Sequence, residues 1–347
     1  MGTKIAVAGD VMLGRLVNDY MRQVTPGHFW GDVLPLIASA DFSLINLECS
    51  LTKSTTPWRR TPKVFHFRAD PAPAIAVLKA ARIGMVNLAN NHVLDFEVEG
   101  LRETLQTLRD AGIRFCGAGM SIAEAAAPAV VEVAGMRIGV IGATDNTPEW
   151  QAAADTPGVN YVEISPDGAA RLAEAVRAAR TAADLLILSL HWGPNMRQRP
   201  TDAFVQFARE MIDAGADIIH GHSAHVFQGL EIYRKKAIMF DTGDFIDDYA
   251  VEPFLRNDQG FLFELAIGQA RGPAPTGAAD GSVSNIVMHP TLIDNFQVNL
   301  ARGTDRDEIL ERMTALCAER GTRVERHGNR LVAFARREPA PAEKMKR

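Results

Sequence analysis

Short apolar runs that end on a polar side chain alternate with helical patterns along most of this chain. The clearest run, Ile83 to Leu88, predicts a short buried strand and is followed by Asn90-Asn91-His92. From Asp95 onward, apolar residues recur at helical spacing until Gly112, which stands where a helix C-cap is expected. Alternating strands and helices predict an α/β fold. The polar residues then fall at the carboxyl ends of strands, where open α/β sheets place their ligands.

The same arrangement recurs at six predicted strand ends. Because these ends meet along one edge of the sheets, we expect their polar side chains to converge there. Carboxylate and amide oxygens mixed with imidazoles suit Mn²⁺, Zn²⁺, Fe²⁺ or Mg²⁺, and Ca²⁺ where oxygens dominate. The alternative is that each residue caps a helix or is a satisfied core residue. The six strand ends are Asp10, Glu48, Asn91, His191, the histidine group at 220–225, and Asp244.

The remaining patterns organise the chain around these strands. Residues 11–15 predict a helix after the first strand, and hairpins are predicted at about 130–141 and 229–240, so the sheets should be mixed. Residues 270–282, rich in Gly, Ala and Pro, predict a flexible connector. The Pro- and charge-rich tail at 337–347 predicts disorder.

Composition excludes several classes of protein. The net charge of −5 over 347 residues gives no basic surface for nucleic acid. Three widely spaced cysteines predict neither a disulfide framework nor a zinc knuckle. No apolar run approaches the roughly 20 residues of a membrane span, and residues 1–9 are too short and strand-like for a signal peptide. We therefore expect a soluble, cytoplasmic protein without a membrane partner.

Six ordered motifs between about residues 4 and 300 resemble a known family. They are Gly9-Asp10, Asn46-Leu47-Glu48, Asn90-Asn91-His92, His191-Trp192-Gly193, Gly221-His222-x-x-His225 and Gly243-Asp244-Phe245. This set is similar to that of the CapA-type proteins of poly-γ-glutamate capsule synthesis, in the calcineurin-like metallophosphatase superfamily. The resemblance implies one metallophosphatase-like domain over residues 1–336, folded as a four-layer α/β/β/α sandwich with two mixed sheets and two divalent metal sites.

The resemblance also implies a role for each matching residue. Glu48 would bridge two cations, and a bridging carboxylate can hold them about 3.5–4 Å apart. His92 would be the proton donor near the substrate. The other ligands would divide between the sites, with Asp10 and His225 on the first metal and Asn91, His191 and His222 on the second.

The chain departs from the family pattern at three places. Met12 stands where the phosphatases carry a histidine ligand, two residues after Asp10. The usual Gly-His-His-Pro-His is interrupted by Ser223-Ala224, and Asp244 replaces the usual asparagine. We therefore expect the first metal to be bound more weakly than the second, or with a preference for harder ligands.

Four further residues are candidates for substrate binding. Arg15, Arg197 and Arg199 closely follow metal motifs, and each could fork onto an anionic group or be an ordinary solvated arginine. Trp58, with two arginines after it, could belong to a lid over the substrate. These residues predict an anionic substrate, such as a peptide carboxylate.

Two residues add to the predicted chemistry. Asp244 could contact substrate or orient a histidine, although a solvated loop acid is an equal alternative. His289 ends an apolar stretch before Pro290 and so repeats the strand-end pattern. It could be an extra acid or base, backed by Asp10, although a lone histidine is usually structural.

Three classes of function are compatible with these features. A metal-dependent hydrolase of phosphoesters or amides would use His92 to protonate the leaving group. A peptide epimerase would use His289 with Asp10 on one face of Cα and His92 on the other. The stretch 243–249, Gly-Asp-Phe-Ile-Asp-Asp-Tyr, is similar to a CapA-like branch that includes epimerases of lasso peptides. A non-catalytic binding protein is the third class. We predict the epimerase, because the altered motifs weaken the hydrolytic pattern, and the oligomeric state stays open.

Overall fold

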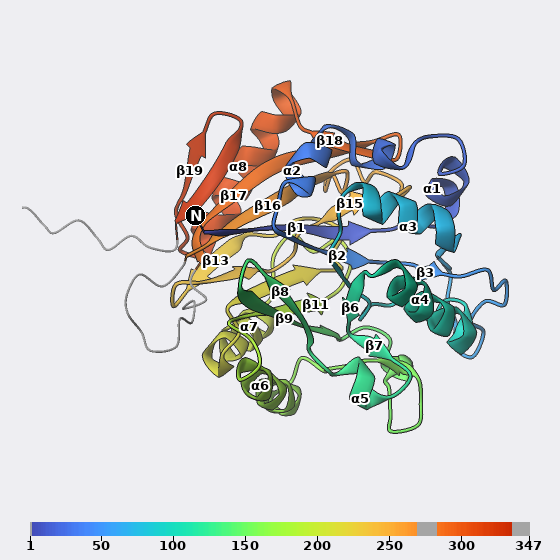
Figure 1. The fold of residues 1–347 in the computed structure, drawn as a ribbon. Helices are drawn as coiled ribbons and strands as arrows, with labels where there is room; N and C mark the ends of the chain where they lie inside the picture. The colour runs from blue at the N-terminus through green and yellow to red at the C-terminus, as the bar shows by residue number, and fades with distance from the viewer. Residues whose placement is uncertain (1, 269–282, 335–347) are drawn as a thin grey trace, which may run out of the picture.

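Two face-to-face β-sheets with helices on their outer faces form this molecule (Figure 1). The computed structural model describes residues 2–268 and 283–334. The predicted connector at 270–282 and the predicted tail at 337–347 lie outside the described residues. The predicted α/β class, with four layers and two mixed sheets, is confirmed by the strand pairings and by three separate layers of core side chains.

The larger sheet has ten strands and is centred on β1 (Thr3–Val11), in which every residue except Lys4 is buried. The other nine are β2 (Phe42–Leu47), β5 (Met85–Asn87), β6 (Arg114–Cys116), β15 (Asp244–Ile246), β16 (Gln259–Ile267), β17 (Val283–Asp294), β18 (Gln297–Leu300), β19 (Val324–His327) and β20 (Arg330–Phe334). Their order is β19-β20-β17-β16-β1-β2-β5-β6, with β15 paired to β1 and β18 to β17. β1 runs parallel to β2 and β15 but antiparallel to β16, so the sheet is mixed.

The smaller sheet has six strands, and the four neighbouring strands at its centre are parallel. Its strands are β8 (Ala129–Val133), β9 (Met136–Thr144), β11 (Leu185–His191), β12 (Ile218–His222), β13 (Leu230–Tyr233) and β14 (Lys236–Met239), in the order β13-β14-β12-β11-β9-β8. β11 is buried throughout, as its uninterrupted apolar sequence requires of a strand covered on both faces. Both predicted hairpins are present, as the antiparallel edge pairs β8–β9 and β13–β14. Two short pairs, β3 (Ser50–Leu51) with β4 (Arg68–Ala69) and β7 (Ala118–Gly119) with β10 (Gly158–Val159), lie apart from both sheets.

Helices cover both outer faces, and the third core layer lies between the sheets. On the larger sheet lie α1 (Arg15–Tyr20), η1 (Pro26–Val33), α2 (Leu34–Ala38), α3 (Pro71–Ala80) and α4 (Glu97–Ala111). On the smaller sheet lie α6 (Pro166–Arg180) and α7 (Asp202–Ala214), which Figure 1 shows on the opposite side of the molecule from α3. α8 (Gly303–Glu319) adds apolar side chains to the layer between the sheets, and α5 (Ile122–Ala125) and η2 (Pro148–Trp150) are short connecting helices. In the described part of the chain, no helix is both long and apolar enough to cross a membrane.

Two expectations about local structure are wrong. The helix predicted over 11–15 does not form, because β1 continues to Val11, which pairs with strands on both sides, and α1 begins only at Arg15. The strand predicted to end at His289 instead continues to Asp294 as β17. Pro290 is accommodated inside it, and its carbonyl accepts a hydrogen bond from the Ala301 N–H at 2.9 Å.

Candidate metal centre

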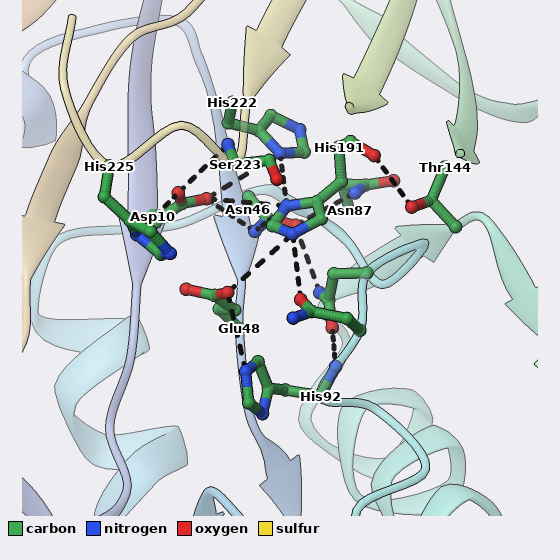
Figure 2. A network of polar contacts seen from close by, with 12 residues as sticks. Asp10, Asn46, Glu48, Asn87, His92, Thr144, His191, His222, Ser223 and His225 are labelled. Atoms are coloured by element: carbon green, nitrogen blue, oxygen red, sulfur yellow. Dashed lines mark hydrogen bonds and ion pairs between the residues drawn. The ribbon is translucent and has the colours of Figure 1, made fainter. Parts of the chain in front are cut away.

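Side chains from both sheets meet in a buried polar cluster at the carboxyl ends of the central strands (Figure 2). Asp10 is the hub, because its two oxygens lie 3.8, 3.7 and 3.8 Å from ring nitrogens of His191, His222 and His225. His191 Nε2 lies 3.7 Å from Glu48 Oε1 and 2.9 Å from Asn91 Oδ1. The structure therefore brings together all six residues that the sequence places on metals. They come from β1, β11, β12 and the turns that follow β2, β5 and β12.

These side chains form two groups that share Asp10. Asp10, His191 and His222 are mutually within 4.8 Å, and so are Asp10, His225 and Asp244. We call the first group, with Asn91, the nitrogen-rich half-site and the second group the oxygen-rich half-site.

Asp244 lies inside the cluster rather than facing an open substrate site. It is fully buried, it pairs with Asp10 in the parallel register of β15 and β1, and its Oδ1 accepts a 2.8 Å hydrogen bond from His225 Nδ1. The predicted direct contact with substrate is therefore not what the geometry provides. Asp244 is placed to orient His225 or to bind a cation beside it.

The donor set fits divalent cations. Glu48 Oε1 and Asp244 Oδ2 are buried carboxylate oxygens without a hydrogen-bond partner in the described structure. Leaving such oxygens unpaired is costly unless a cation or water satisfies them. Ligands about 2.0–2.2 Å from a shared ion are roughly 3–4 Å apart, which matches the spacing of Glu48, Asp10 and the three imidazoles. The cluster can thus hold one or two metal ions.

Burial shifts the pKa values of the carboxylates and imidazoles in the cluster. Burial, followed by the neighbouring Asp10, raises the pKa of Glu48 to about 8. Burial lowers the pKa of His191 and His222 well below the usual range, so both rings are neutral and available as ligands. Burial opposes the charge on His225, but Asp244, Glu48 and Asp10 outweigh it and raise the pKa of this ring.

Met12 takes no part in the cluster. Its side chain is fully buried in the outer core of the larger sheet, and its sulfur accepts a 3.0 Å hydrogen bond from the Gly14 N–H. The imidazole expected at this position has no replacement there. The nearest substitute donor in the oxygen-rich half-site is the carboxylate of Asp244.

Three asparagines form a hydrogen-bonded chain that ends on the Asp10 carboxylate. Asn46 Nδ2 donates to Asp10 Oδ1 at 2.7 Å, while Asn46 Oδ1 accepts from Nδ2 of Asn87 at 2.9 Å and of Asn90 at 3.1 Å. These bonds fix the orientation of the hub carboxylate, as groups around a metal ligand commonly do. Sequence reasoning placed Asn46 in a motif but missed this role.

The turn after β12 holds strained backbone beside the hub. Ser223 and His225 have φ values of 110° and 60°, a region that non-glycine residues rarely adopt. The strained turn aims the Ser223 N–H at Asp10 Oδ2, 3.2 Å away, and His225 at the same carboxylate. Strain of this kind persists where the surrounding structure enforces it, commonly at functional sites.

His92 stands at the edge of the cluster with a fixed orientation. Its Nδ1 lies 2.6 Å from Asp95 Oδ2, and its ring stacks on Phe67 with centroids 3.8 Å apart. Because Asp95 occupies Nδ1, the other nitrogen is left to face Glu48 Oε1, 3.9 Å away. Burial raises the pKa of Asp95 to about 7.

A cavity of about 570 Å³ opens above His92 and His225. Two residues in its wall were missed by sequence reasoning. Lys63 Nζ donates to the Asn91 carbonyl at 2.5 Å and lies 3.2 Å from Asp95 Oδ1, and the Tyr249 hydroxyl donates to Glu48 Oε2 at 3.1 Å. Lys63 and Tyr249 lie on loops, so no strand or helix pattern in the sequence places them at the site. The wall comprises Arg15, Pro62, Lys63, Val64, Phe65, Phe67, Asn91, His92, Asn195, Met196, His225, Tyr249 and Ala250.

Of the four predicted substrate-binding residues outside the cluster, one lines this cavity. Arg15 lies in the wall, 3.3 Å from Asp248. Arg197 and Arg199 instead border a separate pocket of about 210 Å³, and Arg199 makes two 2.7 Å hydrogen bonds to Glu319. Trp58 is buried against Trp150 rather than forming a lid.

In the described structure, His289 Nε2 is buried and has no hydrogen-bond partner. It sits inside β17 opposite Leu262, and the charged groups acting on it are Glu264, Arg330 and Lys4. No hydrogen bond or ion pair between described residues joins His289 to Asp10, and its role as an acid or base backed by Asp10 stays a prediction. Pro290 suggests a strand end at His289, whereas β17 continues to Asp294.

Together, two mixed sheets with helices outside and a buried carboxylate, amide and imidazole cluster at their strand ends define an α/β protein with a candidate dinuclear metal centre. Residues 4–249 match the family described as bacterial capsule synthesis protein PGA_cap. The chain belongs to this family.

Named relatives agree with this membership. The chain is 31% identical over 361 residues to a Mycobacterium tuberculosis protein named "Probable polyglutamine synthesis accessory protein", covering 92% of each. It is 31% identical to the PGA biosynthesis protein CapA of Bacillus subtilis and 28% identical to the capsule biosynthesis protein CapA of Bacillus anthracis. These matches cover 69% and 70% of this chain but 62% and 59% of the respective relatives.

Similarity to solved structures is weaker. A hypothetical protein from Thermus thermophilus gives a TM-score of 0.47 at 13% identity, over 83% of this chain and 98% of the other. Yellow lupin purple acid phosphatase gives 0.35 at 8% identity, over 86% of this chain and 53% of the other.

Proposed function

We propose that this protein is a metal-dependent acid–base enzyme that inverts a Cα centre in an anionic, ribosomally made peptide of the lasso type, acting in the cytoplasm. The observation that carries the proposal is the placement of two protonatable groups on either side of Glu48. His92 Nε2 faces one carboxylate oxygen and the Tyr249 hydroxyl binds the other, and both side chains line the same cavity. Inversion needs one group to remove a proton and another to return it from the opposite face.

The residues around this pair support the same chemistry. Asp95 holds the His92 ring so that Nε2 can exchange a proton in the cavity. Tyr249 is the second proton carrier of this proposal. Arg15 and Lys63 in the wall are the cations available for a substrate carboxylate.

The cluster would hold divalent cations through Asp10, Glu48, Asn91, His191, His222, His225 and Asp244. When bound, they would supply positive charge for the oxyanion that develops as a proton leaves the carbon next to a carboxylate. A C–H bond of this kind is otherwise too weakly acidic to lose its proton readily.

Hydrolysis is the second candidate. The His92–Asp95 pair beside two half-sites is also the arrangement in which an imidazole protonates a leaving group. The family relatives are named for capsule and PGA biosynthesis, so a role for this chain in polymer metabolism belongs to this candidate.

Deuterium exchange separates the two reactions. Purified protein with Mn²⁺ would be incubated in D₂O with a panel of short peptides that end in a free carboxylate, and mass spectrometry and chiral analysis would follow the terminal residue. We expect deuterium uptake with inversion and no cleavage. Replacing Tyr249 with Phe should allow exchange without inversion or stop both, and His92→Gln should lower the rate about 10²–10⁴-fold. Turnover of bis-p-nitrophenyl phosphate with no deuterium uptake from any peptide would replace the epimerase with the hydrolase.

A further inference from the structure

Five large apolar side chains are exposed in the described structure, and four of them line the cavity or follow a residue that lines it. The fifth, Phe254, lies four residues after Ala250 of the cavity wall. Val64 and Phe65 line it directly, and Leu16 and Val251 each follow a lining residue. The exposed fractions are 54% for Leu16, 85% for Val64, 57% for Phe65, 49% for Val251 and 89% for Phe254.

Side-chain contacts connect these segments. The Arg15 guanidinium lies over the Phe65 ring, 5.6 Å from its centroid. The Leu16 N–H donates to Asp248 Oδ2 at 2.9 Å, which ties the start of α1 to the loop that carries Val251. We call these five residues the apolar rim. Exposed apolar side chains beside a polar site are typical of a ligand-binding surface.

The charge of the wall argues against a polyanionic chain. The cavity wall contains one arginine and one lysine, Arg15 and Lys63, and each already faces a carboxylate, Asp248 at 3.3 Å and Asp95 at 3.2 Å. A polymer with a carboxylate on every unit would bring more negative charge than these cations can balance. It would also place charged groups against the apolar rim, where they would lose hydration without gaining a partner.

We propose that the apolar rim binds the bulky apolar or aromatic side chains of a peptide whose free carboxylate reaches the polar cluster. This inference rests on the proposed function, because it names the substrate class of the same site. The apolar side chains of such a peptide would contact the apolar rim. Its single carboxylate would face Arg15, Lys63 and the polar cluster. The substrate class is thus an apolar peptide and not poly-γ-glutamate.

Binding measurements test this without requiring turnover. Fluorescence anisotropy of the Mn²⁺-loaded protein would compare two labelled hexapeptides with free carboxylates, one ending in Leu-Phe-Trp and one made of γ-linked glutamates. We expect the apolar peptide to bind at least tenfold more tightly. The double variant Phe65→Ser/Phe254→Ser should lose about tenfold in affinity for it, because exposed side chains that become buried on binding are removed.

The matched control is Arg59→Ser, an exposed residue of the same loop as Phe65. It should leave the affinity for the apolar peptide unchanged. Equal or tighter binding of the γ-glutamyl peptide, or unchanged affinity in the double variant, would overturn the inference. Rim-dependent binding to phosphatidylglycerol vesicles, without peptide binding, would also overturn it and assign the rim to a membrane surface. If the protein binds apolar peptides through the rim but exchanges no deuterium, the binding inference holds and the proposed reaction is wrong.

Discussion

The two half-sites share one carboxylate but differ in how the chain builds the rest. In the nitrogen-rich half-site, His191 and His222 stand directly opposite each other on neighbouring parallel strands, and Asn91 completes the set. In the oxygen-rich half-site, the imidazole expected at position 12 is missing, and Asp244 lies beside Asp10 instead. Imidazole favours Zn²⁺ and Fe²⁺, whereas carboxylates favour Mg²⁺, Mn²⁺ and Ca²⁺. The difference indicates that a carboxylate on another strand, Asp244 on β15, can take the place of the imidazole expected at position 12. Such an exchange would change which metal the half-site prefers.

Removing the shared carboxylate should have the largest effect, because it belongs to both half-sites. In Asp10→Ala, we expect the metal content after dialysis to fall from about two equivalents per chain to near zero, with loss of activity. Plasma mass spectrometry of the dialysed protein measures this directly. Asp110→Ala, an exposed acid on α4, is the control and should keep both ions. Two retained equivalents in Asp10→Ala would disprove the shared role.

Removing Asp244 should affect only one half-site. In Asp244→Asn, we expect about one equivalent of metal per chain to remain, held by the nitrogen-rich half-site. The electron paramagnetic resonance signal of Mn²⁺ in the oxygen-rich half-site should disappear. Asp247→Asn is the matched control, because Asp247 is buried in the same turn but belongs to neither group. If both variants keep two equivalents, Asp244 is only a partner that orients His225.

The next effect is a pH dependence of the metal-free protein. Burial raises the pKa of Glu48 and of Asp241 to about 8 each, above the values of these groups in the unfolded chain. The folded state therefore binds more protons, and this contribution to stability is complete below about pH 4 and lost as the pH rises to about 8. Above about pH 6.5, where the buried rings of His191 and His222 are neutral in both states, the Tm of the metal-free protein should fall by about 5 °C as the pH rises to about 8.

Added Mn²⁺ should flatten this dependence in part. A bound cation favours the carboxylate form of Glu48, whereas Asp241 accepts hydrogen bonds from the Ala224 and Gly243 N–H groups and keeps its own contribution. Differential scanning calorimetry at several pH values checks both statements. An unchanged slope after Mn²⁺ addition would mean that Glu48 binds no metal.

The smallest expected effect is at the position of the missing imidazole. Met12→Leu should leave metal content unchanged and lower the free energy of unfolding by about 0.5–1.5 kcal/mol, because it removes only a buried hydrogen bond and slightly alters packing. Urea denaturation and metal analysis of the same sample measure the two quantities. A lost metal equivalent would show that the sulfur contributes to the oxygen-rich half-site after all.

How far the sequence predicts this molecule depends on how local each feature is. The two sheets and the strand-end position of His191 follow from apolar runs that stop at a polar residue, and such runs are visible within short stretches of the chain. The place of Asp244 depends on the pairing of β15 with β1, which joins distant parts of the chain. Lys63 and Tyr249 reach the cavity through loops whose paths no periodicity encodes. Local order is therefore predictable here, and loop contacts are not.

The cluster takes its side chains from both sheets, so its residues are translated at widely separated times. β1 is made before the other described strands, but in the folded sheet it lies between β2 and β16, and β16 spans residues 259–267. The smaller sheet, which carries His191 and His222, is also made long after Asp10. A nascent chain therefore cannot assemble a complete cation cage until most of it has been translated. We therefore expect metal loading to be a late step in the synthesis of this protein.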